Sequence, residues 1–252
     1  MKIRFLADYP VAFIPEIKTL VVAELHLGIE YALYKSGIFI PPQGAEFLKT
    51  IENLIKMTKA KNLVLVGDIK HKVPGSSIRE DREIPKFLSL LKEKIKVVLV
   101  KGNHDDQIEE IVPEGIKIYS SRGCKIKNYG FFHGHAWPSK QLIKCDYLFM
   151  GHVHPAIEFI DAFGFRSIEQ VWVKAKLDAE KVKKKYKVDR TGKLNFVILP
   201  VFNKMLGGIP INKIAREELI GPILKNKFTN LDEAKVYLVD GTYLGRVKNL
   251  RS

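Results

Sequence analysis

The fold is decided by a pattern that starts at Leu63-Val64-Leu65-Val66 and runs directly into Gly67-Asp68. The same form, a short apolar run followed at once by a polar cluster, occurs at Leu20-Val21-Val22-Ala23-Glu24-Leu25-His26 and at Val97-Val98-Leu99-Val100-Lys101-Gly102-Asn103-His104-Asp105. Short β-branched runs that are apolar on both faces are typical of strands buried within a sandwich. Polar side chains just past the carboxyl ends of such strands lie where open α/β sheets bind ligands.

Two amphipathic segments fit between these runs, and their apolar residues recur with helical spacing. They are Phe47, Leu48, Ile51, Leu54 and Ile55 in the first segment and Ile84, Phe87, Leu88 and Leu91 in the second. Strands and helices in alternation predict parallel pairing with right-handed crossovers. After about residue 115, short strand-like runs with fewer helices predict a second, more antiparallel sheet. We therefore expect an α/β fold, a four-layer αββα sandwich of two mixed β-sheets flanked by helices. Residues 1–252 would form a single domain, in which 156–252 complete the sandwich.

The composition bounds the kind of protein. The chain has 252 residues, with 42 Lys and Arg against 28 Asp and Glu, so the formal net charge is 42 − 28 = +14. This excess favours a polyanionic partner, but a lysine-rich solvated surface explains it equally well. Cys124 and Cys145 lie in apolar stretches without a CxxC partner, so we expect no disulfide framework. Charge interrupts the N-terminal residues too soon for a signal peptide, and no apolar run approaches the roughly 18 residues of a membrane span. We expect a soluble cytoplasmic protein without membrane association.

Seven histidines occur at the ends of apolar runs, close to glycines or carboxylates. They are His26, His71, His104, His133, His135, His152 and His154. Two pairs, His133-Gly134-His135 and His152-Val153-His154, place imidazoles at i and i+2, which on a strand project from one face. A lone histidine is more often structural than functional, but this clustering indicates one site.

The chemistry that needs such a set is two-metal hydrolysis. Two divalent cations about 3.5–4 Å apart require a bridging carboxylate and a shell of oxygen and nitrogen ligands. Asp68 is the candidate bridge, because Gly67 lets the backbone turn sharply at the strand end. Asn103 offers a neutral oxygen after Gly102 in the same way. Imidazole and carboxylate suit Mn, Ni, Fe, Zn or Co, and we expect two divalent transition-metal ions, with Mn favoured.

Five segments in this order resemble the blocks of the calcineurin-like metallophosphoesterase superfamily. They are Glu24-Leu25-His26, Gly67-Asp68, Gly102-Asn103-His104-Asp105, His133-Gly134-His135 and Gly151-His152-Val153-His154. Order and spacing agree over roughly residues 20–155. Residues 23–30, 67–71 and 200–212 are also similar to archaeal and bacterial phosphoesterases related to the nuclease SbcD. This narrower likeness covers nearly the whole chain.

The resemblance implies a role for each segment. One metal would be held by Glu24, His26, Asp68 and His154, and the other by Asp68, Asn103, His133 and His152. By its position in the block, His133 rather than His135 is the ligand. His104 would contact the scissile phosphate and stabilise the developing charge or protonate the leaving oxygen, with Asp105 orienting it. The nucleophile would be a metal-bound hydroxide.

Some positions leave alternatives open. The family pattern begins with aspartate where this chain has Glu24, and the extra methylene moves the carboxylate by roughly 1.5 Å unless the side chain folds back. We expect metal binding to be retained but retuned. Lys70, His71 and His135 are expected to bind substrate phosphate. For Lys70 and His71, the alternative is a loop contact or exposure to solvent. For His135, the alternative is that it supports the metal ligands.

The function implied by the resemblance is hydrolysis of phosphodiesters, with DNA or RNA as candidate substrate. Eight basic residues between Lys174 and Arg190 favour nucleic acid. Two alternatives stay open, namely a small-molecule nucleotide phosphodiesterase or phosphatase and a nucleic-acid-binding protein with a degenerate metal site. The chain is too short for a large DNA-capping domain with an ATPase-docking arm, whereas a separate helicase or ligase partner is compatible with it. The oligomeric state is left open.

Overall fold

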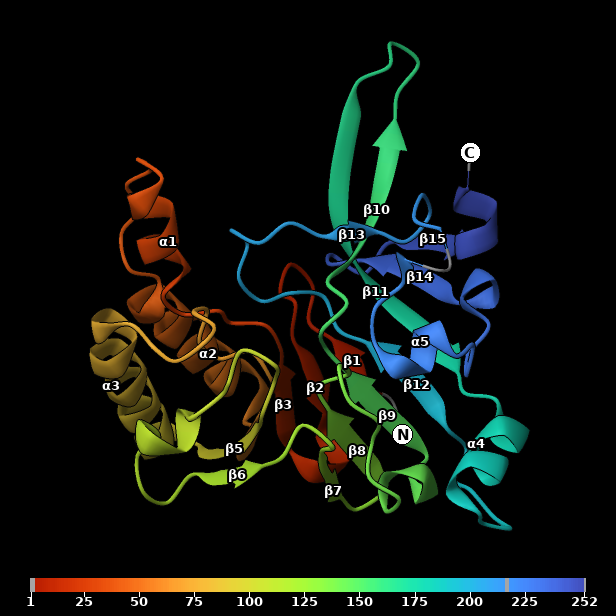
Figure 1. Cartoon of the computed structure of the whole chain (residues 1–252), viewed down its shortest axis with the longest axis horizontal. Coiled ribbons are helices and arrows are strands. Elements are labelled where there is room, and N and C mark those ends of the chain that lie inside the picture. Colours follow the sequence, from red (N-terminus) through yellow and green to blue (C-terminus); the bar gives the residue numbers. More distant parts are fainter. Residues whose placement is uncertain (1–2, 216–217, 252) are drawn as a thin grey trace.

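The computed structural model describes residues 3–215 and 218–251, which form two β-sheets that pack face to face (Figure 1). The first sheet has six strands, in the order β1 (Arg4–Phe5), β2 (Ala12–Ile14), β3 (Thr19–Val22), β4 (Asn62–Val66), β5 (Lys96–Val100) and β6 (Lys117–Tyr119). Strands β3 to β6 are parallel, as the strand–helix alternation predicted. Strands β1 and β2 extend the sheet in antiparallel fashion.

The second sheet has nine strands. They are β7 (Cys124–Ile126), β8 (Tyr129–Phe132), β9 (Tyr147–Met150), β10 (Pro155–Ile160), β11 (Arg166–Lys176), β12 (Asn195–Ile198), β13 (Ile209–Pro210), β14 (Lys235–Leu238) and β15 (Tyr243–Arg246). Strands β8, β9 and β12 are parallel, whereas β7–β8, β10–β11, β11–β12, β11–β14 and β14–β15 are antiparallel pairs. The expected second, more antiparallel sheet is therefore present. Its β10–β11 hairpin extends beyond the body of the molecule (Figure 1).

Helices cover the outer faces of both sheets (Figure 1). Helices α1 (Ile29–Lys35), α2 (Gly44–Thr58) and α3 (Ile78–Lys94) lie on the side of the first sheet, and α4 (Ala179–Tyr186) and α5 (Pro222–Lys225) on the side of the second. Single 3₁₀ turns are η1 (Pro15–Ile17), η2 (Ile108–Glu110), η3 (Leu142–Lys144), η5 (Leu231–Glu233) and η6 (Val247–Leu250). The predicted helical segments 47–55 and 84–91 lie within α2 and α3. No helix among the described residues has the length and apolar character needed to cross a membrane.

The strands bury side chains on both faces, because successive residues of a strand point to opposite sides of the sheet. In β4, Leu63 and Leu65 pack in the core beneath α2 and α3, whereas Val64 packs between the two sheets. In β9, Phe149 lies between the sheets and Leu148 packs on the side of α4 and α5. These three apolar clusters confirm the four-layer sandwich. The assignment of all 252 residues to one domain stays a prediction.

Candidate metal centre

The predicted segments meet where β3, β4, β5, β8 and β9 end. The backbone there has an unusual conformation. Positive φ values between 42° and 68° occur at Glu24, His26, Asp68, His152 and His154. Non-glycine residues adopt this region rarely, and such strain persists where the surrounding structure enforces it, often at functional sites. The strain therefore coincides with five of the predicted metal ligands.

The first predicted ligand group is assembled around Glu24. Its Oε2 lies 3.1 Å from His26 Nε2 and 2.9 Å from His154 Nε2. Ligand atoms of these three residues lie within 4.8 Å of one another, a spacing that suits one metal ion. Glu24 is fully buried and His26 nearly so, so an ion held here would be largely shielded from solvent.

The second predicted ligand group is assembled around His133, which is also fully buried. Its Nε2 lies 3.5 Å from Asp68 Oδ2 and 3.1 Å from Asn103 Oδ1. Ligand atoms of Asp68, His133 and His152 also lie within 4.8 Å of one another. The four residues expected to hold the second metal are thus brought together.

Asp68 lies between the two groups. Its Oδ2 is 3.6 Å from His26 Nε2 in the first group and 3.5 Å from His133 Nε2 in the second. The other oxygen, Oδ1, accepts a hydrogen bond from the backbone N–H of His104 at 2.9 Å. This position is the one that a bridging carboxylate would need.

Two glycines permit this close approach of the loops. A methyl carbon added to Gly102 would lie 1.9 Å from Asp68 Oδ1, and one added to Gly67 would lie 2.0 Å from His133 Nδ1. Gly67 also has a φ of 80°. Any side chain at either position would push a predicted ligand out of place.

The electrostatics of the site fit divalent cations. Burial and the neighbouring Glu24 carboxylate raise the pKa of Asp68 to about 9, so a cation is needed to stabilise its charged form. Burial lowers the pKa of His133 to about 3 and that of His152 to about 4. Both imidazoles are therefore neutral at pH 7, with a lone pair free to bind a metal.

Glu24 reaches both ligand groups despite its extra methylene. Its second oxygen, Oε1, accepts a hydrogen bond from His152 N at 2.5 Å and lies 3.3 Å from His133 Nδ1. Burial would raise the pKa of Glu24, but the imidazoles of His133, His154 and His26 outweigh it and hold that pKa well below its usual range. A charged Glu24 therefore faces the imidazoles.

His104 lies beside the centre, but its partner differs from the expected one. Its Nδ1 lies 2.5 Å from the carbonyl oxygen of His71, so Nδ1 carries the proton. Asp105, expected to orient this ring, instead accepts hydrogen bonds from the backbone N–H groups of Ile69 and Gly102, both at 2.8 Å. Asp105 therefore ties the loop after β4 to the loop after β5, and the carbonyl of His71 orients His104.

Lys70 also differs from the expectation. Its side chain is 1% exposed, and its Nζ donates to the carbonyls of Lys72 and Gly75, both at 2.7 Å, and pairs with Asp106 at 2.5 Å. With these partners its ammonium group holds the 72–75 loop and is not directed at a substrate phosphate. The geometry matches the open alternative of a loop contact.

His71 and His135 lie at the edges of the two groups. The Nδ1 atoms of His71 and His26 are 3.4 Å apart, and His71 also lies beside His104. The His135 ring centroid lies 5.1 Å from that of His133, and its buried Nδ1 has no hydrogen-bond partner among the described residues. Both positions are compatible with the expected phosphate contacts.

Three supports of the centre come from outside the five segments. Asn203 is buried, and its side chain donates to the carbonyl of Leu25 at 2.9 Å, while Ile209 N donates to the carbonyl of His154 at 2.7 Å. Glu80, which was not among the expected residues, accepts hydrogen bonds from His71 N and Lys72 N. The Ser77-x-x-Glu80 spacing is a capping-box signal from which Glu80 could have been found.

Comparison with known proteins places this centre in a family. The sequence profile of the calcineurin-like phosphoesterases matches residues 17–194. No curated protein matches the sequence. Among solved structures, nuclease MPE from Pseudomonas putida is 18% identical and has a TM-score of 0.60, with 95% of this chain and 94% of that chain covered. Yfce, a phosphoesterase from E. coli, is 14% identical with a TM-score of 0.41, over 90% of this chain and 97% of that one.

At such low identity, the likeness to nuclease MPE supports the fold alone, the expected αββα sandwich. The family match covers all five segments and most of the chain. Members of this family use divalent metal ions, in agreement with the two ligand groups. The chain therefore belongs to the calcineurin-like phosphoesterases and is a hydrolytic enzyme that acts on phosphate esters.

Proposed function

We propose that the chain is a two-metal phosphodiesterase that acts on nucleic acid. The observation that carries the two-metal assignment is the position of Asp68 Oδ2, 3.6 Å from an imidazole of one ligand group and 3.5 Å from an imidazole of the other. When bound, two divalent cations would supply an activated water molecule and neutralise phosphate charge. Nitrogen and oxygen ligands without cysteine suit several divalent transition metals, and we propose Mn among them.

The protein's own residues would position and protonate the substrate. His104, held by the carbonyl of His71, would contact the scissile phosphate and donate a proton from Nε2 to the leaving oxygen. The hydrogen bond from Nδ1 to a carbonyl fixes the orientation of the ring, so that Nε2 is the nitrogen available for this step. His135, with its unpartnered Nδ1, is the second candidate for a phosphate contact.

A groove lined by lysines supports nucleic acid as the substrate. It has a volume of about 910 Å³ and lies where β3, β4 and β5 begin and α2 and α3 end. Its lysines are Lys18, Lys56, Lys59, Lys61, Lys92, Lys94 and Lys96. Lys94 pairs with Glu52 and Lys92 donates to the backbone carbonyl of Glu114, whereas the others have no ion-pair partner among the described residues. Phosphate backbones bind such clusters through release of counterions.

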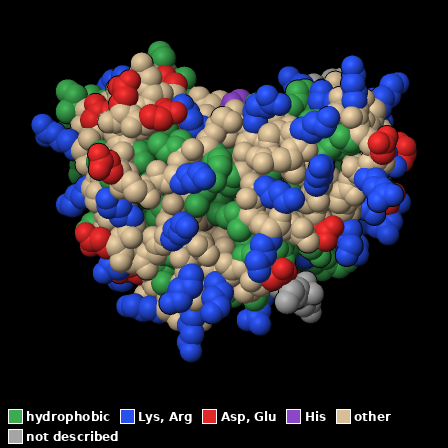
Figure 2. Space-filling model, turned by 90° about the horizontal axis from the view of Figure 1, so that it is seen from below, with side chains coloured by type: hydrophobic (Ala, Val, Ile, Leu, Met, Phe, Trp, Pro, Cys, Tyr) green, Lys and Arg blue, Asp and Glu red, His purple; other side chains and the backbone are tan. Residues whose placement is uncertain are grey.

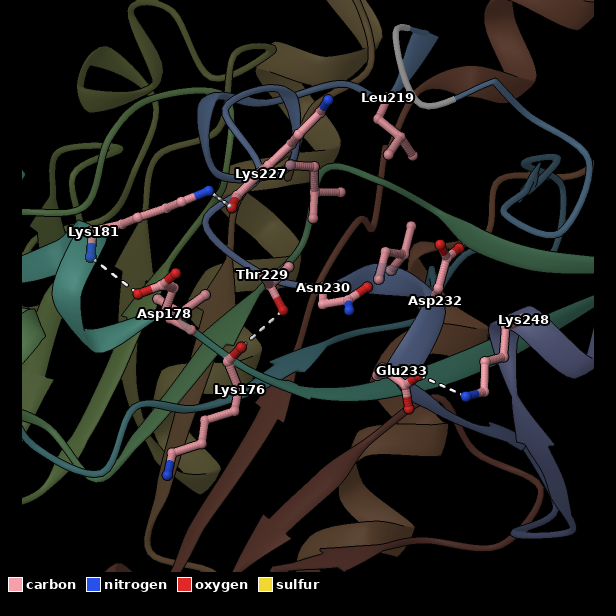
Figure 3. A pocket seen from close by; sticks show the side chains of 13 residues that line it. Lys176, Asp178, Lys181, Leu219, Lys227, Thr229, Asn230, Asp232, Glu233 and Lys248 are labelled. Carbon is pink, nitrogen blue, oxygen red and sulfur yellow. Dashed lines mark hydrogen bonds and ion pairs between the residues drawn. The ribbon is translucent and has the colours of Figure 1, made fainter.

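The basic segment 174–190 supports this substrate less than its composition indicated. Lys181 donates to the carbonyl of Lys227, in a depression that Figure 3 shows. Lys183 pairs with Glu180, and Lys185 lies 3.5 Å from the centre of the Trp137 ring. On the face drawn in Figure 2, basic side chains nevertheless outnumber acidic ones, so the positive charge extends well beyond this segment.

The two alternatives predict different behaviour. A small-molecule phosphodiesterase would have no use for the lysine groove. A degenerate metal site would normally have lost ligands, but here the described donors still form both groups. The proposal therefore accounts for more of the molecule than either alternative does.

Turnover of a chromogenic diester and of single-stranded DNA tests the proposal. After metal removal, activity should return with Mn. Asp68→Asn, which loses the charge of the proposed bridging ligand, and His104→Ala, which loses the proposed proton donor, should each lower kcat at least about 100-fold. Lys125→Ala, an exposed change on β7, is the control. Activity without metal, or activity that survives Asp68→Asn, would contradict the proposal.

A further inference from the structure

A cavity of about 730 Å³ opens beside the metal centre. His71 and His104 line one part of it, and α1 and the start of α3 line the rest. Since His104 is the proposed phosphate contact, a group attached to the scissile phosphate can enter this cavity directly. Its volume is that of a typical small-molecule site and far exceeds what a phosphate group alone requires.

The cavity combines an aromatic ring with two cations. Tyr31 of α1 lines it, and Lys35 Nζ lies 4.7 Å and Arg79 Cζ 5.6 Å from the centre of the Tyr31 ring. Both side chains are exposed, and Arg79 also lies near Glu83, which is on the same helix. Val73 and Ile78 add apolar surface, and both are at least half exposed. An aromatic ring beside exposed cations is the combination with which proteins bind a base and its neighbouring phosphate.

Buried carboxylates hold the walls of the cavity in place. Glu80 is 1% exposed and accepts hydrogen bonds from the backbone N–H groups of His71, Lys72 and Ser77 at 2.6 to 2.9 Å. Glu30 is 3% exposed and accepts from Gly28 N at the start of α1 and from Gln43 N at the start of α2. The backbone of the cavity walls is thus held in position before a ligand arrives, which limits the entropic cost of binding.

We infer that this cavity binds the nucleoside next to the scissile phosphate, with its base on Tyr31 and the following phosphate near Lys35 and Arg79. The inference rests on the proposed function and narrows its substrate to nucleotides and nucleic acid. A phosphate ester of a small alcohol would leave the cavity unfilled and bind more weakly.

Nucleotide binding tests the inference separately from catalysis. Isothermal titration calorimetry of the Mn-loaded protein would compare adenosine 5′-monophosphate with inorganic phosphate. We expect the nucleotide to bind more tightly, and Tyr31→Ala to weaken its binding about tenfold, in the range of one base–aromatic stack, without changing phosphate binding. Tyr31→Phe should retain nucleotide affinity, because the ring is kept.

Tyr34→Ala is the matched control, since Tyr34 lies on the same helix, is 55% exposed and does not line the cavity. If Tyr31→Ala also loses phosphate binding, Ala32→Trp fills the cavity from an exposed position and should weaken nucleotide binding alone. The inference would be overturned if the wild-type protein bound the nucleotide no more tightly than phosphate. It would also be overturned if neither Tyr31→Ala nor Ala32→Trp changed the affinity for the nucleotide. Diester turnover tests the proposed function independently, so a failure of the nucleoside site can be distinguished from a failure of the proposed phosphodiesterase activity.

Discussion

Glu24 is the residue at which this chain departs from the family pattern, and the structure shows a use for its additional methylene. One carboxylate oxygen faces His26 and His154, while the other reaches His152 N and His133 Nδ1. The side chain thereby holds ligands of both predicted metal ions. An aspartate at the same backbone position is shorter by one carbon–carbon bond and could not reach both sides.

Glu24→Asp should therefore weaken metal binding, although it restores the residue usual in the family. We expect Mn affinity to fall about tenfold or more, as is typical when a group that orients metal ligands is lost. Calorimetric titration of the metal-free protein with Mn measures this, with Glu93→Asp on the exposed face of α3 as control. Equal or tighter Mn binding by Glu24→Asp would show that the longer side chain has no such role.

The start of α3 is the element that connects the fold to the centre. Ser77 and Glu80 form a capping box there, and Glu80 also binds the N–H groups of His71 and Lys72. The carbonyl of His71 in turn orients His104. One helix cap thus fixes the loop on which the proposed phosphate contact depends.

Glu80→Gln should disturb the loop and the site together. The amide replaces one accepting oxygen by a donor, which faces backbone N–H groups, so we expect a loss of about 2–3 kcal/mol in the free energy of unfolding. A rise in KM for the diester should accompany it, because His71 and His104 lose their support. Urea denaturation and steady-state kinetics measure both effects, with the exposed Glu93→Gln as control on the same helix. A variant with unchanged stability would contradict the role assigned to Glu80.

At the scale of the whole molecule, the lysine groove and the metal centre lie at different ends of the first sheet. The lysine groove lies where β3, β4 and β5 begin, whereas the metal ligands follow the ends of these parallel strands. A nucleic acid bound at both would have to extend along the first sheet. A small substrate would contact the centre alone.

Reversing charges in the groove should therefore separate the two kinds of substrate. Lys61→Glu combined with Lys96→Glu should weaken DNA binding and reduce the slope of log affinity against log salt by about 2. Turnover of a small chromogenic diester should stay the same. Lys184→Glu, on the exposed side of α4, combined with Lys187→Glu, directly after the helix, is the matched control. Equal effects of the two double variants would indicate a general charge effect and no specific use of the groove.

The elements that could be predicted are those with a strong local pattern. Strands β3, β4 and β5 follow from their apolar runs, and α2 and α3 from their helical spacing. Helix α1 was not expected, since it is only seven residues long and buries little of its surface. Strands β1 and β13 have two residues each, which is too short for a local pattern, and β13 is held by pairing with β10, which lies far away in the sequence.

The sequence alone determined the chemistry of the centre, because ligand type and order are properties of the chain, and each polar cluster directly follows an apolar run. Tertiary structure decided how these groups are used. Lys70 turned inward because Asp106 and two carbonyls surround its ammonium group, and Asp105 binds backbone N–H groups of a neighbouring loop. These contacts join loops that follow different strands, so only the packing of the sheet brings the partners together.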